Sequence, residues 1–219
     1  FRIPDLIFQV LAGATLGSAF IPVFTRLTKR ESNEKAWDLA GNIVSTILIA
    51  TIILCLIMLI IAPWIVPLFS PGLGEDIGRE KELTDKAISL TRIMLLSPLL
   101  LAVSGMVTGI LNARQQFFLP ALAPMLYNIG IIFGALVLAK QWGIEGLTIG
   151  VLIGSGLHLV IQIPGIIRTK IWSRFKINLR DKAATEVRRL MAPRVIGLIA
   201  GQINFVVTKP NGTVWYDNT

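Results

Sequence analysis

The chain has 219 residues, of which 53% are hydrophobic and only 16% are charged, and its mean hydropathy is +0.70. A soluble domain carries about 25% charged residues, so this composition excludes most classes of soluble protein. A formal charge of +8 is common among nucleic-acid-binding proteins. Here, however, the basic residues fall in the gaps between apolar stretches, and we therefore expect no nucleic-acid partner.

Six stretches without charged residues follow one another along the chain, at 6–25, 39–74, 93–113, 115–139, 146–167 and 195–208. Five of them reach the roughly 20 residues that cross a bilayer, and the sixth does so only if flanking residues extend its helix. Segment 47–61 lacks the alternating polarity of a transmembrane barrel strand. We predict an all-α polytopic membrane protein with about six transmembrane helices, at approximately 5–25, 38–62, 87–111, 118–139, 144–167 and 188–207.

Prolines and glycines indicate how these helices bend and pack. Proline removes a backbone donor, and we predict hinges at Pro22 in the first helix and Pro98 in the third. Four further prolines are explained as helix ends: Pro63, Pro67, Pro120 and Pro193. Glycines spaced four residues apart let helix backbones approach closely. Pairs at 13/17, 105/109, 130/134, 146/150, 150/154 and 197/201 therefore predict a compact bundle.

The charges of the connections alternate along the chain and predict its orientation. Connection 26–35 is mainly basic, 75–86 is mixed, and 168–189 holds eight basic and two acidic residues. Because excess Lys and Arg marks cytoplasmic loops, we expect 26–35, Arg114 and 168–189 to be cytoplasmic. If the complete protein begins in the cytoplasm, at least one further helix precedes this chain. The 168–187 connection is either an interfacial helix or a solvated basic linker.

Catalytic and metal-binding motifs are absent from the sequence, so we expect neither an enzyme nor a bound metal or cofactor. Cys55 and His158 are the only residues of their types and fit packing roles. No charge-free stretch contains a carboxylate, so these segments offer no counter-charge for a coupling cation. Cations that face a central cavity would suit a phosphate-bearing substrate, although snorkelling to the interface explains most of them. Hydrogen bonding between helices is the ordinary explanation of the neutral polar residues. The candidate substrate-binding residues are Arg2, Arg92, Arg194, Asn42, Asn112, Gln202 and Asn204.

Several segments resemble, in order and spacing, the MurJ/MviN family of lipid II flippases. Segments 1–6 and 13–24 resemble the second helix of that family, and segments 62–64, 70–72, 109–112, 119–124, 162–164 and 191–193 resemble later parts. The resemblance extends to Asn128, Gly197, Gln202 and Asn204. It implies a two-lobe exporter bundle of fourteen helices, of which this chain would supply helices two to seven: most of one lobe, with 188–207 as the first and truncated helix of the second.

The same resemblance implies a function and a location. The substrate would be an undecaprenyl-pyrophosphate-linked peptidoglycan precursor, moved by alternating access across the bacterial inner membrane. Membrane lipids and cell-wall synthesis enzymes would be its other partners. Another exporter of the superfamily, for polysaccharide units or drugs, and a non-transporting membrane scaffold are the alternatives.

Two segments depart from the family pattern. Phe8 and Gln9 stand where family members often carry a basic pair, whereas Arg2 matches a basic position and is the leading cavity candidate. The tail 208–219 does not resemble the family, and we interpret it as a truncated or frame-broken end.

Overall fold

The computed structural model describes residues 19–69, 80–167, 169, 176–178 and 180–208, and its regular elements over these residues are all helical. The prediction of an all-α polytopic membrane protein is thus confirmed. The elements are α2 (Ile21–Arg30), α3 (Asn33–Phe69), α4 (Glu80–Met94), α5 (Leu96–Ala113), α6 (Phe118–Phe133), the π-helical turn η3 (Gly134–Leu138), α7 (Ala139–Trp142), α8 (Ile144–Val160), α9 (Ile163–Ile166) and α10 (Lys182–Thr208).

Four helical segments among the described residues are long and apolar enough to cross a membrane: Asn33–Pro67, Lys81–Ala113, Phe118–Trp142 and Ile144–Ile166. They overlap the expected spans at 38–62, 87–111, 118–139 and 144–167. Most of the expected span at 5–25 lies outside the described residues, as do the tail from 209 onward and much of the 168–187 connection. The expected span at 188–207 lies within α10, which already begins at Lys182.

Three prolines that we expected to end helices lie inside them instead. Pro63 and Pro67 fall within α3, and Pro193 falls within α10. A proline inside a transmembrane helix is tolerated because neighbouring groups and local adjustments satisfy the freed backbone carbonyls. The helix-end interpretation was therefore wrong at these positions.

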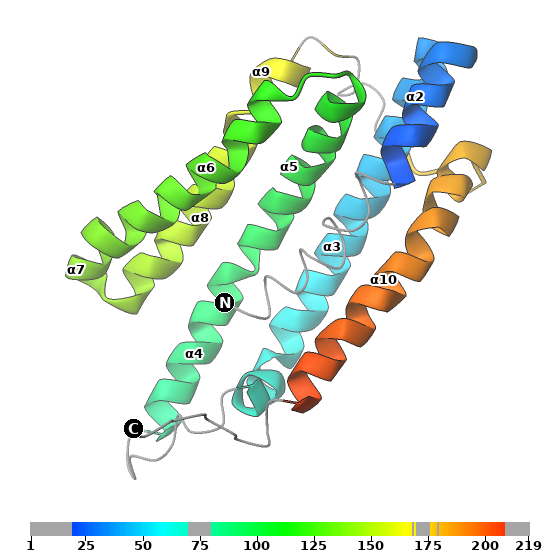
Figure 1. Ribbon diagram of the computed structural model, residues 1–219. Coiled ribbons are helices and arrows are strands. Elements are labelled where there is room, and N and C mark those ends of the chain that lie inside the picture. The colour runs from blue at the N-terminus through cyan, green and yellow to red at the C-terminus, as the bar shows by residue number, and fades with distance from the viewer. Residues whose placement is uncertain (1–18, 70–79, 168, 170–175, 179, 209–219) are drawn as a thin grey trace, which may run out of the picture.

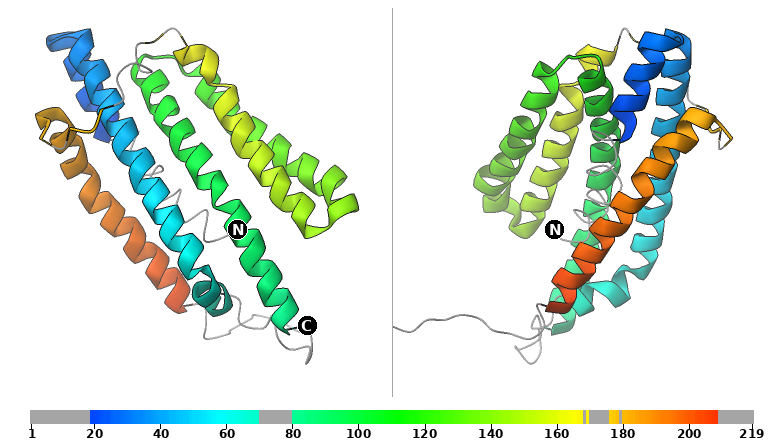
Figure 2. Two further views of the ribbon diagram at one scale, coloured as in Figure 1. Left: turned by 180° about the vertical axis from the view of Figure 1, so that it is seen from behind. Right: turned by 45° about the vertical axis from the view of Figure 1, so that its right-hand side comes forward.

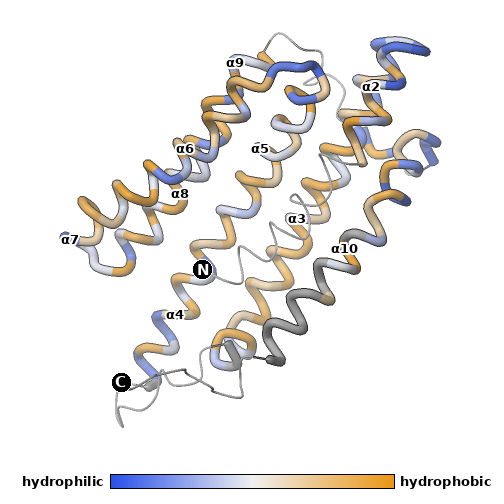
Figure 3. Tube along the Cα trace, in the orientation of Figure 1, coloured by the Kyte–Doolittle hydropathy of each residue, from blue (hydrophilic) through white to orange (hydrophobic). Residues whose placement is uncertain are grey.

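The long helices lie side by side in a flattened bundle (Figures 1 and 2). The α6–α8 pair forms one side, α4 and α5 run through the middle, and α3 with α2 and α10 forms the other side. Apolar residues cover the middle of the helices, while polar residues gather toward the ends (Figure 3). Many large apolar side chains in the middle are exposed, including Ile53, Ile60 and Leu136, as expected for surfaces that face lipid.

Glycines set the spacing between α6 and α8. A Cβ added at Gly150 would lie 2.4 Å from the Cα of Gly134, and one added at Gly130 would lie 2.4 Å from the Cα of Gly154. Contacts this short leave no room for any side chain, so the two backbones touch along the 130/134 and 146/150/154 glycines. The glycine spacing predicted closely packed helices, and the structure shows that α6 and α8 are a pair that it joins.

The main apolar core joins α2, α3, α5 and the start of α10. Its most completely buried side chains include Phe20, Leu39, Ile43, Met106 and Ile110. In addition, Phe24 packs edge-to-face on Trp37 with ring centroids 5.6 Å apart. This core lies toward the end of the bundle where α2, α9 and the first turn of α10 also lie (Figure 1).

The two hinge candidates have different local structures. Leu95 interrupts the helical segment between α4 and α5, three residues before Pro98. The Pro98 nitrogen cannot donate to the carbonyl four residues earlier, and its ring crowds that carbonyl, which explains a break at this position. Pro22 lies in the first turn of α2, just after two π-helical residues. Whether either position moves remains a prediction.

Candidate functional site

Two of the predicted substrate-binding residues join segments of the fold. Asn42 is buried in α3, where its Nδ2 donates to the carbonyl of Asn178 at 2.8 Å and its Oδ1 accepts from the Asn178 amide at 3.1 Å. Arg92 is exposed on α4, and its Nε donates to the Leu59 carbonyl of α3 at 3.3 Å. Asn42 thus docks the chain that precedes α10, whereas Arg92 keeps most of its guanidinium exposed.

The remaining predicted residues divide into one that is described and four whose side chains are not. Asn112 is half-buried near the end of α5, where its backbone carbonyl accepts from the amide of Gln115 at 3.0 Å. Arg2 lies outside the described residues. Arg194, Gln202 and Asn204 lie along the α10 backbone, but their side chains are not among those described. The substrate roles of all seven residues therefore stay predictions.

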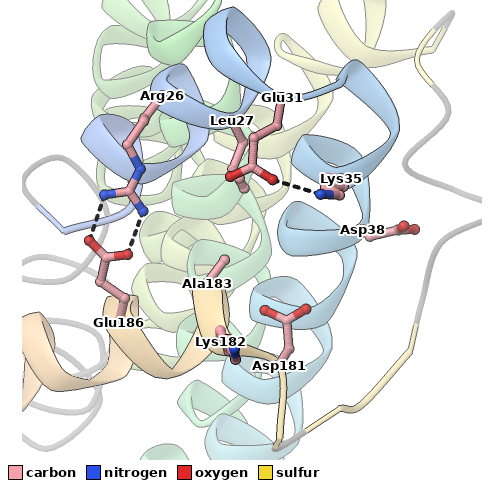
Figure 4. A pocket seen from close by; sticks show the side chains of 9 residues that line it. All are labelled: Arg26, Leu27, Glu31, Lys35, Asp38, Asp181, Lys182, Ala183 and Glu186. Carbon is pink, nitrogen blue, oxygen red and sulfur yellow. Dashed lines mark hydrogen bonds and ion pairs between the residues drawn. The ribbon is translucent and has the colours of Figure 1, made fainter.

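A pocket of about 430 Å³ opens at the end of the bundle where α2, α3 and α10 meet (Figure 4). Its lining carries charges of both signs from the three helices and from the turn before α10. The lining residues are Arg26, Leu27, Glu31, Lys35, Asp38, Asp181, Lys182, Ala183 and Glu186. With three cationic and four anionic side chains, the pocket favours pairing between its own walls over the capture of an anion.

A two-pronged ion pair crosses this pocket. The Arg26 Nη1 donates to Glu186 Oε1 at 2.9 Å, and Nη2 donates to Oε2. The hydrogen bond and the charge of Arg26 hold the pKa of the Glu186 carboxyl below its usual range, and Glu186 raises the pKa of Arg26 in turn. A second ion pair joins Lys35 Nζ to Glu31 Oε2 at 2.8 Å, which raises the pKa of Lys35.

Sequence reasoning missed the pairing of Arg26 with Glu186. These residues are 160 positions apart, and hydropathy assigns both only to polar connections. The available signal was weaker: both connections were predicted on the same side of the membrane, with opposite charges among them. Opposite charges in two connections are compatible with many ion pairs and do not identify any one of them.

A polar network ties α5 to α8 within the apolar bundle. The Ser104 Oγ lies 2.6 Å from His158 Nδ1, and Gln162 Nε2 donates to Ser104 Oγ at 2.8 Å. The Thr108 hydroxyl donates to Gln162 Oε1 at 2.8 Å. His158 therefore fills the packing role expected of it, because its ring nitrogen and carbonyl are both engaged by neighbouring side chains.

A second buried hydrogen bond also joins α5 to α8. The hydroxyls of Ser97 and Ser155 lie 2.7 Å apart and are both buried. Hydrogen bonds of this kind between membrane helices contribute about 0.6 kcal/mol each on average. Together with the glycine contacts of α6 and α8, they make α5, α6 and α8 one closely joined unit.

The described polar side chains join helices to one another through hydrogen bonds and ion pairs. No group of three or more His, Cys, Asp or Glu residues within the described ranges is placed to hold a metal ion. Three carboxylates are paired with Lys or Arg at the ends of the bundle: Glu31, Glu145 and Glu186. The described part of the chain thus offers ion pairs at its ends and neutral hydrogen bonds in its middle.

Comparison with known proteins gives a consistent set of relatives. The family model described as lipid II flippase MurJ matches residues 1–210. Lipid II flippase MurJ of Burkholderia cenocepacia is 25% identical over 94% of this chain and 40% of its own length. Probable lipid II flippases MurJ of Haemophilus influenzae and Bdellovibrio bacteriovorus are each 27% identical, over 94% and 99% of this chain.

A solved structure, lipid II flippase MurJ in an inward closed conformation, is also similar to this chain. It is 27% identical over 94% of the chain and 41% of its own length, with a TM-score of 0.68. The chain thus spans about two fifths of the length of the relatives that it matches.

Proposed function

Because the chain belongs to the lipid II flippase MurJ family, we propose that it forms part of a flippase for lipid-linked peptidoglycan precursors. The complete protein would move its substrate from the inner to the outer leaflet of the bacterial inner membrane. The observation that carries this proposal is the family match, which runs without a break over residues 1–210. The similarity in fold, with a TM-score of 0.68 to a flippase of known structure, supports it.

The helices described above have properties that suit transport by alternating access. The α5–α6–α8 unit is held by touching glycines and buried hydrogen bonds, so it can move as one body. The α4–α5 segment breaks at Leu95, which gives a place for bending next to Pro98. Alternating access needs both features, because rigid groups of helices must rock around a few bends.

The charge distribution supports an orientation for this part of the flippase. The end that carries Arg26, Lys29, Arg30, Arg114 and Lys182 would face the cytoplasm by the positive-inside rule. The end that carries Glu82, Asp85 and Glu145 would then face the periplasm.

Substrate binding in this proposal depends on cations next to the helices. Arg2, Arg92 and Arg194 would contact the pyrophosphate, since guanidinium groups bind phosphate oxygens in pairs. The amide side chains of Asn42, Asn112, Gln202 and Asn204 would line the same path. Transport in this proposal would involve neither catalysis nor a cofactor. Cell-wall synthesis enzymes that produce or consume the precursor would be the partners at the membrane.

The test is lipid II exposure in cells that depend on the full-length protein containing this chain. We expect depletion to lower the amount of lipid II that an external headgroup-cleaving enzyme can reach, and re-expression to restore it. Arg92→Gln should lower the exposure, while Lys81→Gln, an exposed change on the same helix, should not. Unchanged exposure after depletion would reject the proposed function.

A further inference from the structure

The contacts described for α10 with α2 and α3 lie in its first turns. Ala184 and Val187 are completely buried and belong to the same apolar core as α2 and α3, and Met191 packs against that core. Farther along, Ile196 is 67% exposed, and a Cβ added at Gly197 would meet nothing within 4 Å. The first turns of α10 lie beside α2 and α3 (Figures 1 and 2).

Polar contacts fix this docked end in position. Asp181 caps the helix, since its Oδ1 accepts from the Ala184 amide at 2.7 Å. Asn42 of α3 holds the backbone of Asn178 just before the helix. The Arg26–Glu186 pair then joins α2 directly to the second turn of α10 (Figure 4).

The ion pair lies where water can reach it. The Arg26 and Glu186 side chains are 44% and 41% exposed, and the 430 Å³ pocket opens beside them. An exposed pair of this kind is weak and reversible. Such a contact is unsuited to holding a core permanently, but it is well suited to shifting an equilibrium between two arrangements.

We propose that Arg26 and Glu186 form a latch that holds the start of α10 against α2 and α3 and closes this end of the bundle. The inference rests on the proposed function, in which this basic end is the inward side of a flippase. When the latch opens, α10 separates from the α2–α3 pair and exposes the buried faces of Ala184 and Val187.

A buried cysteine at the docked face can measure this opening. In the full 219-residue chain with Cys55→Ala, reconstituted in liposomes, Val187→Cys should react with a water-soluble maleimide only when α10 separates. Labelling rates are divided by those of the same variant unfolded in detergent, which corrects for the reactivity of the thiol in its local sequence. The test variants are Arg26→Glu, Glu186→Arg and the double variant that carries both changes.

We expect each single reversal to raise the normalised labelling rate by about two- to fivefold or more, since it replaces attraction by repulsion, and the double variant to restore the original rate. Lys29→Glu is the matched control, because it makes the same reversal of charge at an exposed α2 residue outside the pocket lining, and it should leave the rate unchanged. If a reversal prevents folding, Arg26→Gln and Glu186→Gln make the same comparison.

The latch would be overturned if the single variants were labelled at the same rate as the chain without a charge reversal. It would also be overturned if the double variant were not protected again. Both results are independent of transport, because the labelling experiment measures only the docking of α10. If instead the proposed function is wrong, depletion will leave lipid II exposure unchanged, and the labelling rates will still change as expected for the latch.

Discussion

The contact between α6 and α8 predicts that one methyl group at Gly150 destabilises the bundle, whereas the same change at Gly156 does not. A Cβ at Gly150 would lie 2.4 Å from the Gly134 Cα, against about 3.4 Å for an ordinary contact, so the backbones would have to separate by about 1 Å. Gly156, on the same helix, has nothing within 4 Å of such a Cβ. Both changes relieve the same helical cost of glycine, about 0.5–1 kcal/mol, so this gain cancels in the comparison.

The difference between the two variants therefore reports overpacking alone. Overpacking of a close contact costs about 1–3 kcal/mol, and we expect Gly150→Ala to be less stable than Gly156→Ala by that amount. The assay is reversible unfolding in mixed micelles with increasing sodium dodecyl sulfate, followed by circular dichroism. Equal free energies of unfolding for the two variants would refute the reasoning, since they would show that the α6 and α8 backbones do not touch at Gly150.

Three further predictions concern the polar groups and the α4–α5 break. Ser104→Ala leaves His158 Nδ1 without its 2.6 Å partner and should lower the unfolding free energy by about 1 kcal/mol, in the same micelle assay. The lowered pKa of Glu186 stabilises docking at pH values above the ordinary carboxyl range, near 4.3; this contribution is lost as the pH falls through the lower folded value. Exposure of Val187→Cys to a disulfide reagent that reacts in acid should accordingly rise there, and a rate independent of pH would contradict the shift. Pro98→Ala supplies the missing amide donor, and we expect hydrogen exchange to show that amide protected; rapid exchange would assign the break to another cause.

Hydropathy predicted the helices because the membrane imposes a length and a composition on each span. The four spans found among the described residues follow from the charge-free stretches, and the glycine spacing predicted close packing without indicating which helices pair. The boundaries were less accurate, since α3 continues past Pro63 and Pro67 to Phe69. Proline indicates a helix end reliably in water, but neighbouring helices compensate for it in a membrane.

The start of α10 could have been found from the sequence. Asp181 precedes Lys182 and accepts a hydrogen bond from the Ala184 amide, which is the pattern of an N-terminal cap. The basic residues around it favoured the prediction of a surface connection instead. The Arg26–Glu186 pair could not have been found in this way, because its geometry depends on how α10 docks in three dimensions and not on either local sequence.

In the candidate site, too, the sequence predicted which residues are polar but not which groups they contact. Residue type identified Asn42 and Arg92 as polar groups beside apolar helices, but their partners, Asn178 and Leu59, became visible only in the folded chain. A buried amide that satisfies a passing backbone and an amide that contacts a substrate have the same sequence signature. The sequence alone therefore does not indicate which partner such an amide has.

Membrane topology gives the most direct test of the account, since the transport proposal and the latch both assume which end faces inward. In intact cells that express the chain with Cys55→Ala, an impermeant maleimide should label Gln141→Cys, on α7, and should reach Lys29→Cys, on α2, only after permeabilisation; both positions are exposed. Labelling of Lys29→Cys from outside intact cells, with Gln141→Cys protected, would contradict the orientation on which the mechanism depends.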